Sequence, residues 1–77
     1  MNMNITENTK INDLMKQYPW LLDEVIKIDE RVKIVKKNPL AKMFLKNATI
    51  KGVSELAGMD VKTLLEQISN LIKQHET

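Results

Sequence analysis

The side chains that most often carry out chemistry in proteins are scarce in this sequence. It has one histidine, His75, and no cysteine. A histidine that acts as a general base needs a partner and a sheltered site. His75 continues the apolar helical spacing of Leu71 and Ile72. Its imidazole therefore either reaches the rim of the core, where haem or another flat ligand can bind, or lies in a fraying last turn that faces the negative end of the helix dipole. We favour the second interpretation.

The acidic residues do not form a pair suited to acid–base catalysis. Asp23-Glu24 and Asp29-Glu30 are neighbours in the sequence, and neighbouring side chains on a helix point about 100° apart. The sequence also lacks a glycine-rich loop of the kind that holds phosphates. It therefore predicts a protein that is not an enzyme, with no cofactor and no metal site.

A basic stretch stands out against a weakly charged chain. Residues 31–51 hold seven lysines and arginines and no acid, whereas the whole chain has a formal net charge of +2. Nucleic-acid binding needs several cations on one surface, and the only ring in the stretch, Phe44, falls on an apolar arc and offers no platform for stacked bases. We favour the other interpretation, in which the lysines keep short helices soluble and offset nearby acids. The candidate binding cations are Lys33, Lys36, Lys37, Lys42 and Lys46.

Trp20 is a further candidate for partner binding. On a helix it falls beside Glu24, outside the apolar arc. A large indole outside the core stripe can mark a contact with a protein or a ligand. It can equally fold back over the start of its own helix, against Tyr18 or another segment of the chain. Trp20 and His75 therefore join the basic residues as candidates for a partner-binding site.

The elements that must position these residues are helices. Periodicity predicts an all-α, compact bundle of about five short helices in a single domain over residues 9–75, after a flexible N-terminus over residues 1–8. We expect Thr9 to cap the first helix and Pro19 to end it. Residues 29–37 have no clean period, and they predict a turn followed by an irregular segment.

The middle of the chain carries a helix-start signal. Asn38-Pro39 predicts a start because asparagine caps well and proline suits the first helical position. In the helix that follows, Met43 and Phe44 fall on the apolar arc that should face the core. In the second helix Ile28 falls on the corresponding arc.

The C-terminal half is helix–turn–helix-like. Thr49 predicts the cap of one helix, Gly58 its end and Asp60 the cap of the longest helix. In a DNA-reading motif the exposed positions early in the second helix carry side chains that read base edges, but Val61 and Leu65 occupy those positions here. We therefore expect the shape without DNA recognition. The two helices are expected to bury Ile50, Val53, Leu56, Ala57, Val61, Leu64, Leu65, Ile68, Leu71 and Ile72.

The order of these signals resembles a known family. The pieces are TKINDLMKQYP, the Asn38-Pro39 start and ATIKGVSELAGMDVKTLLEQI. Together, from about Thr6 to Ile72, they are similar to the small helical family catalogued as domain of unknown function 1858. The resemblance implies a helical module that occurs alone or attached to sensor, hemerythrin-like and iron–sulfur-associated proteins. It therefore implies a redox or iron–sulfur-related context for the partner.

Related modules are similar to the N-terminal part of di-iron proteins for iron–sulfur repair. Those proteins carry cysteines shortly after the second helix. The corresponding place here is Ile28–Arg31, which has no cysteine. Thiol redox chemistry and cysteine–metal binding are therefore not carried over to this chain.

The sequence as a whole predicts a non-catalytic interaction module. A core built from 77 residues rarely supplies more than about 3–5 kcal/mol, so we expect binding to a protein partner or self-association. The alternative is a nucleic-acid-binding module that uses residues 31–51. The apolar runs are far shorter than the roughly 20 residues of a membrane span, and residues 1–10 show no signal-peptide pattern. We expect a cytoplasmic protein without membrane contact.

Overall fold

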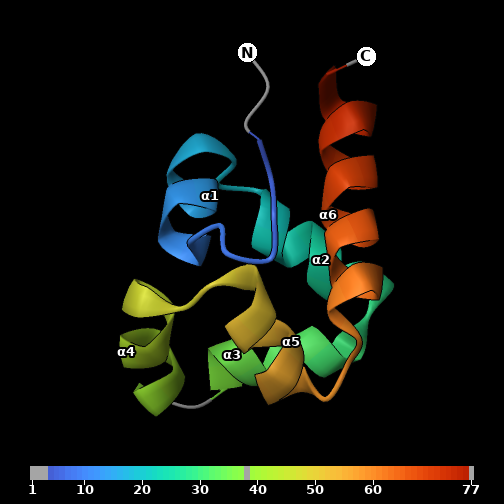
Figure 1. Cartoon of the computed structure of the whole chain (residues 1–77). Coiled ribbons are helices and arrows are strands. Elements are labelled where there is room, and N and C mark those ends of the chain that lie inside the picture. The colour runs from blue at the N-terminus through green and yellow to red at the C-terminus, as the bar shows by residue number, and fades with distance from the viewer. Residues whose placement is uncertain (1–3, 38, 77) are drawn as a thin grey trace.

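Helices make up most of the part of the chain that the structure describes. The computed structural model describes residues 4–37 and 39–76, and the side chains of all of these except 39–42. The elements in chain order are α1 (Ile11–Gln17), α2 (Leu21–Ile28), the 3-10 helix η1 (Glu30–Lys33), α3 (Ile34–Lys37), α4 (Pro39–Asn47), α5 (Ile50–Ala57) and α6 (Val61–Glu76). The predicted all-α bundle is confirmed, with α3 as the helix that the sequence pattern missed (Figure 1).

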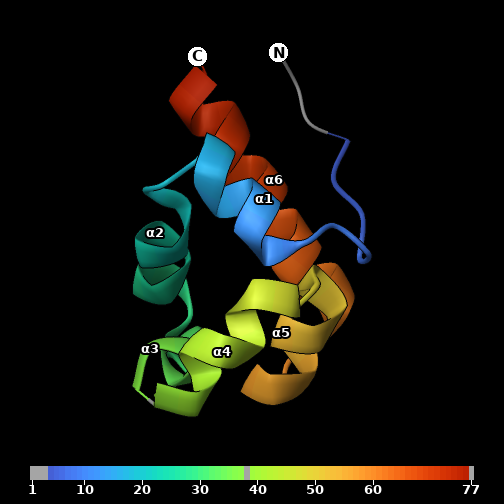
Figure 2. The same ribbon diagram turned by 90° about the vertical axis from the view of Figure 1, so that its left-hand side faces the viewer.

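The core lies between α6 and the shorter helices. α6 packs against α2 and α5, whereas α4 packs against α1 and α3. In both ribbon views α3, α4 and α5 form the base of the molecule, and the C-terminal end of α6 lies at the opposite end (Figures 1 and 2). The buried apolar residues are Ile11, Leu14, Tyr18, Leu21, Val25, Val32, Val35, Ala48, Ile50, Val53, Met59, Leu64, Ile68, Leu71 and Ile72. Four of the residues expected on the α6 stripe are thus confirmed as core.

The predicted boundaries of α5 and α6 are confirmed. The Thr49 hydroxyl accepts a hydrogen bond from the Gly52 N–H at 3.2 Å, which satisfies a donor at the start of α5. Gly58 ends α5 with a φ of 68°, in the left-handed region that side chains disfavour. The Asp60 carboxylate accepts a hydrogen bond from the Thr63 N–H at 3.4 Å, at the start of α6.

Thr9 does not cap α1, contrary to the prediction. Lys10 occupies the capping position and its side chain makes no capping hydrogen bond. The Thr9 hydroxyl instead accepts a hydrogen bond from the Thr6 N–H at 2.9 Å. The physical reason is that the chain before α1 is held extended, because the Ile50 N–H donates to the Thr9 carbonyl at 3.0 Å and the Ile11 N–H donates to the Ala48 carbonyl at 2.9 Å.

The segment before Thr9 also contacts the rest of the molecule. The Lys51 N–H donates to the Glu7 carbonyl at 3.0 Å, and Ile5 packs against the core. The flexibility expected for residues 1–8 stays a prediction, since residues 1–3 lie outside the described part. At the other end of α1, the prediction that Pro19 ends the helix is confirmed, with Tyr18 as the last capping residue. Pro19 itself lies in the turn before α2.

The prediction of an irregular segment over residues 29–37 is wrong. The Asp29 carboxylate accepts a hydrogen bond from the Arg31 N–H at 3.1 Å and starts η1, which continues directly into α3. Val32 and Val35 are 1% and 0% exposed. The pattern was missed because a 3-10 turn followed by one α-helical turn has no sustained period of 3.6 residues. The proposed Asn38 cap lies outside the described residues, and Pro39 is the first residue of α4, as predicted.

Four apolar side chains that should face the core are exposed instead. Ile28, Met43, Phe44 and Leu56 have exposed fractions of 55%, 68%, 38% and 40%. α4 lies at the edge of the bundle, where its partners are α1 and α3, so only part of its arc is covered. The Phe44 ring lies over Gly52 of α5, whose Cβ, if it had one, would be 3.3 Å from Phe44 Cζ. Position in the bundle thus overrides the helical pattern in these places.

Candidate functional site

The helical run from η1 into α3 has two faces. Val32 and Val35 on one face enter the core. The spacing of Glu30, Lys33, Ile34 and Lys37 by three and four residues brings them together on another side of the run. With Arg31, these four residues line a surface hollow with a volume of about 350 Å³, within the range of roughly 300–1,000 Å³ that is typical of ligand sites. We call it the α3 hollow.

The residues that line the α3 hollow differ in chemistry. Ile34 is 43% exposed, so it offers apolar surface. Lys33 and Lys37 are exposed, and no carboxylate of the described residues forms an ion pair with either of them. Glu30 is the one acid of the lining. The hollow therefore combines an aliphatic contact surface with a surplus of positive charge.

Arg31 is held by Asp29. Its Nε lies 2.9 Å from Asp29 Oδ1 and its Nη2 lies 2.6 Å from Asp29 Oδ2, which is the two-point geometry that guanidinium and carboxylate groups favour. The pKa of Asp29 is lowered from 3.8 to about 2, mainly by the side-chain hydrogen bonds from Arg31 and to the smallest extent by Gln67, against the opposing effect of burial. Asp29 in turn raises the pKa of Arg31. The pair positions Arg31 at the hollow and offsets its charge.

Asp29→Asn is expected to change the acid stability of the protein. Because the folded-state pKa of Asp29 is lower than 3.8, its ionised form stabilises the fold at higher pH, and this contribution is lost as the pH falls from about 4 toward 2. Arg31 is 53% exposed in this pair, so the variant should lose only about 0.5–1 kcal/mol at pH 7. Asparagine keeps an acceptor for the start of η1. Urea unfolding at pH 7, 4 and 2 should show the difference from wild type shrinking with acid.

A matched control separates this pair from acid effects in general. Glu66→Gln removes one exposed carboxylate from α6 and should leave the pH dependence of unfolding nearly unchanged. A constant difference between wild type and Asp29→Asn from pH 7 to pH 2 would show that the charge of Asp29 does not stabilise the fold.

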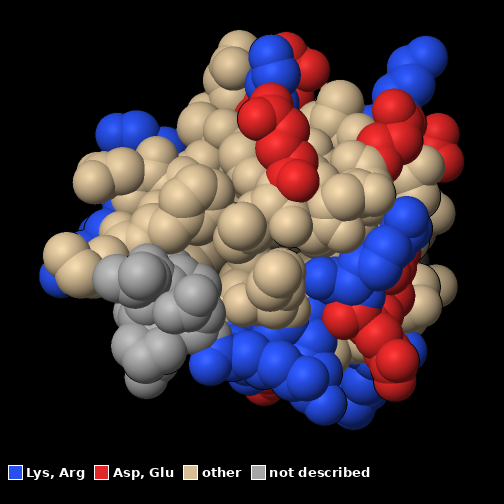
Figure 3. Space-filling view, turned by 90° about the horizontal axis from the view of Figure 1, so that it is seen from below, with Lys and Arg blue, Asp and Glu red and all other residues tan. Residues whose placement is uncertain are grey.

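The other predicted cations are divided among several places. Lys36 forms an ion pair with Asp23 of α2, which ties α3 to α2 and engages the charge of this predicted binding residue. Lys46 is exposed on α4 and has no ion pair within the described residues. The side chain of Lys42 lies outside them. Figure 3 shows the base of the molecule, where Lys and Arg side chains form a band with Asp and Glu side chains beside it.

Sequence reasoning found part of the hollow and missed the rest. It singled out Lys33 and Lys37, which the structure brings together. It missed Ile34 and Glu30, because the segment was not interpreted as helical. The spacing of the four residues was the signal that would have identified them, since residues three or four apart are neighbours on a helix.

Trp20 folds back onto its own chain, the second of the two predicted alternatives. Its ring lies edge-on to Tyr18 at a centroid distance of 5.8 Å. It also stacks on His75 of α6, with centroids 3.6 Å apart and an interplanar angle of 17°. The Tyr18 hydroxyl lies 3.5 Å from Glu76 Oε1. These contacts join the C-terminal turn of α6 to the α1–α2 turn, at the end of the molecule opposite α3 (Figure 1).

The Trp20–His75 stack has a direct optical test. Trp20 is the single tryptophan of the chain, so all indole fluorescence reports on this contact. His75→Ala should uncover one face of the indole, shift its emission to longer wavelength and increase quenching by acrylamide. The stability loss should be about 0.5–1.5 kcal/mol, the usual contribution of an aromatic pair. Lys73→Ala, on an exposed residue of the same turn, is the control. Equal quenching in both variants would exclude the stack in solution.

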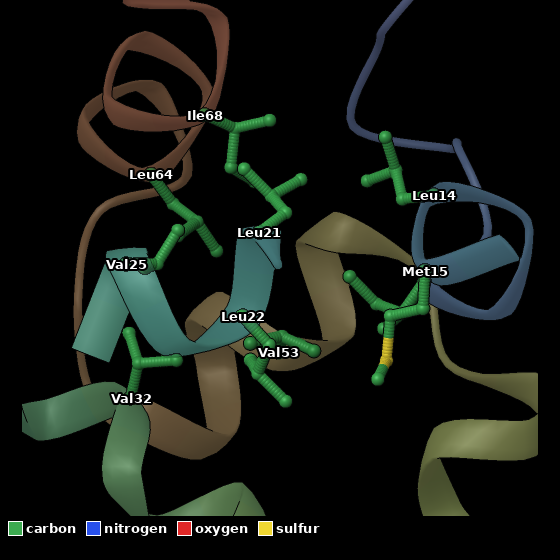
Figure 4. Close-up of a pocket in the computed structure, with 10 residues that line it drawn as sticks. Leu14, Met15, Leu21, Leu22, Val25, Val32, Val53, Leu64 and Ile68 are labelled. Carbon is green, nitrogen blue, oxygen red and sulfur yellow. The ribbon is translucent and has the colours of Figure 1, made fainter. Parts of the chain in front are cut away.

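Apolar side chains line a small gap in the core. A gap of about 30 Å³ between α1, α2, α5 and α6 is lined by apolar side chains, among them Leu21 and Val25 of α2 and Leu64 and Ile68 of α6, which point toward one another (Figure 4). Such a lining gives a water or a polar ligand nothing to bind. Across residues 4–37 and 39–76, no three His, Cys, Asp or Glu side chains gather to hold a metal ion. No described helix has the length and apolar character that crossing a bilayer requires.

Comparison with known proteins gives this chain no relative. It matches no protein-family model, no curated protein and no solved structure. The resemblance to the domain of unknown function 1858 family therefore stays a prediction from the order of sequence signals. The candidate site stands on the geometry of the α3 hollow alone.

Proposed function

We propose that this chain is a non-catalytic helical interaction module that binds a protein partner through the α3 hollow. One observation carries the proposal. Ile34, 43% exposed, lines the α3 hollow together with two lysines that have no ion pair within the described part of the chain. Isolated apolar side chains are common on surfaces, but an exposed apolar side chain in the lining of a charged hollow is suited to contact with a side chain of a partner.

The chemistry of the lining supports binding and not catalysis. The hollow contains lysines, an arginine, a glutamate and an isoleucine. Glu30 is exposed, whereas a general base needs shelter and a partner. Arg31 is engaged with Asp29. These groups can attract and orient an anionic segment, and none of them is placed against a second group that would activate it.

Nucleic-acid binding through residues 31–51 remains the alternative proposal, and the geometry favours it less. Lys36 is turned to Asp23, so it does not add to the charge of the hollow. Glu30 lies among the remaining cations and would repel phosphates. The lining has no aromatic ring on which bases could stack.

Site-specific photocrosslinking tests the proposal. A benzoylphenylalanine at position 34 should crosslink to one recurring protein in lysate of the source cells, and the purified partner should then bind the wild-type module in calorimetry. The same residue at position 56 is the matched control, because Leu56 is 40% exposed and Ile34 is 43% exposed. Equal crosslinking from both positions, or none from position 34, would contradict the proposal. A crosslink to nucleic acid would favour the alternative, and one to a second copy would indicate self-association.

A further inference from the structure

We infer that the occupant of the α3 hollow is an acidic amphipathic helix, with two carboxylates one helical turn apart and an aliphatic side chain between them. This inference rests on the proposed function and specifies the partner of the same site. It follows from the arrangement of charge and apolar surface in the hollow.

The first argument is the spacing of the cations. Lys33 and Lys37 are four residues apart and both line the hollow. Four residues along a helix correspond to about 6 Å of rise. Two carboxylates at positions i and i+4 of a partner helix have the same separation, so each can meet one lysine without bending either backbone. The two carboxylates of such a partner helix thus match the two lysines in both charge and spacing along the helix.

The second argument is the position of Ile34. It lies next to Lys33 in the sequence and one turn from Lys37, and it lines the same hollow. An aliphatic side chain at position i+1 or i+3 of the partner helix would lie between its two acids. It would then cover the exposed part of Ile34 and remove apolar surface from water. A phosphate group has no apolar atoms that would cover this surface.

The third argument is the acid within the hollow. Glu30 lies one turn before Lys33 and Ile34 on the same side of the run. Its carboxylate lowers the positive potential at its own end of the hollow. An acidic ligand is therefore attracted most strongly near Lys37, at the other end. Removing its charge should therefore strengthen the binding of an acidic helix, which gives the inference a variant that gains affinity.

The test uses a defined probe in low-salt buffer. A fluorescein-labelled, acetylated and amidated helical peptide with Glu-Leu-Ala-Leu-Glu in an alanine-rich host is titrated with the full chain, and binding is followed by anisotropy. Lys33→Glu combined with Lys37→Glu should weaken binding by about tenfold or more, and Ile34→Ser should weaken it severalfold. Glu30→Gln should strengthen it severalfold. The positions are exposed, so circular dichroism should show an unchanged fold.

Two kinds of control distinguish the site from general charge. Lys16→Glu combined with Lys73→Glu changes the net charge equally at exposed residues of α1 and α6, and should change affinity little. A peptide with Gln for Glu and one with Ser for Leu should both bind more weakly, and a single-stranded DNA 15-mer should not compete. Equal loss in both double variants, equal binding of the Gln peptide, or absence of binding would overturn the inference.

Tighter binding of the DNA than of the peptide, with no effect of Ile34→Ser, would overturn it in favour of nucleic acid. The peptide titration and the crosslinking experiment can give different answers, so failure of this inference can be distinguished from failure of the proposed function. A partner that crosslinks from position 34 but contacts the hollow without acidic residues would keep the proposed function and overturn this inference alone.

Discussion

Replacing Val35 by Asp is expected to leave the chain largely unfolded at neutral pH. Val35 is 0% exposed in the helical run that the sequence pattern did not predict. Burying a carboxylate without a partner costs several kcal/mol, which equals or exceeds the roughly 3–5 kcal/mol that a core of this size supplies. Far-UV circular dichroism should show loss of most helical signal, and urea should produce no cooperative transition.

Ile34→Asp is the matched control, because it makes the same chemical change one residue away. Ile34 is 43% exposed, so its carboxylate stays in water and the stability should change by only about 0.5 kcal/mol. If Val35→Asp unfolded cooperatively with the same midpoint as wild type, Val35 would not be buried in the core, and α3 would not be fixed to the rest of the bundle. The two variants together therefore test whether this short helix is part of the core.

Leu64→Ala should produce the second largest effect, a loss of about 3–4 kcal/mol in the free energy of unfolding. Leu64 is 1% exposed and lines the gap of about 30 Å³ between α1, α2, α5 and α6 (Figure 4). Truncating it removes buried methyl groups and enlarges a cavity that is already present, and the cost rises with the volume that remains empty. The measurement is urea unfolding followed by circular dichroism, with lower temperature to extend the folded baseline.

Leu65→Ala provides the comparison for this variant. Leu65 is on the same helix but only partly buried against the core, so its truncation should cost about 1 kcal/mol. Both substitutions introduce the same residue into α6, and helix propensity therefore cancels between them. Equal losses in the two variants would mean that α6 does not pack through the face that contains Leu64.

The sequence was sufficient to predict where a helix begins and ends when the residues at its ends make the capping contacts. Thr49, Gly58 and Asp60 act through backbone groups within a few residues, so their roles could be predicted without the tertiary structure. The stripe of α6 is also long enough for its period to be clear. The same reasoning failed for α3, which is a single turn after a 3-10 helix.

The remaining differences arise from contacts between distant parts of the chain. Met43 is exposed because α4 lies at the edge of the bundle, and Thr9 is drawn into an extended segment by residues after α4. The Trp20–His75 stack joins two residues that no local pattern relates. In the candidate site, the sequence alone identified the cations Lys33 and Lys37. That Ile34 lines the same hollow could be predicted only with the helical geometry of the segment.

The backbone pairing at the start of α1 has a consequence for synthesis of the protein. The Ile11 N–H donates to the Ala48 carbonyl, and the Thr9 carbonyl accepts from the Ile50 N–H, so the start of α1 is held by residues 48–50, which follow α2, α3 and α4 in the chain. A chain that emerges from the ribosome N-terminus first has no partner for these groups until α5 follows. α1 can therefore reach its final place only after residues 48–50 have been synthesised.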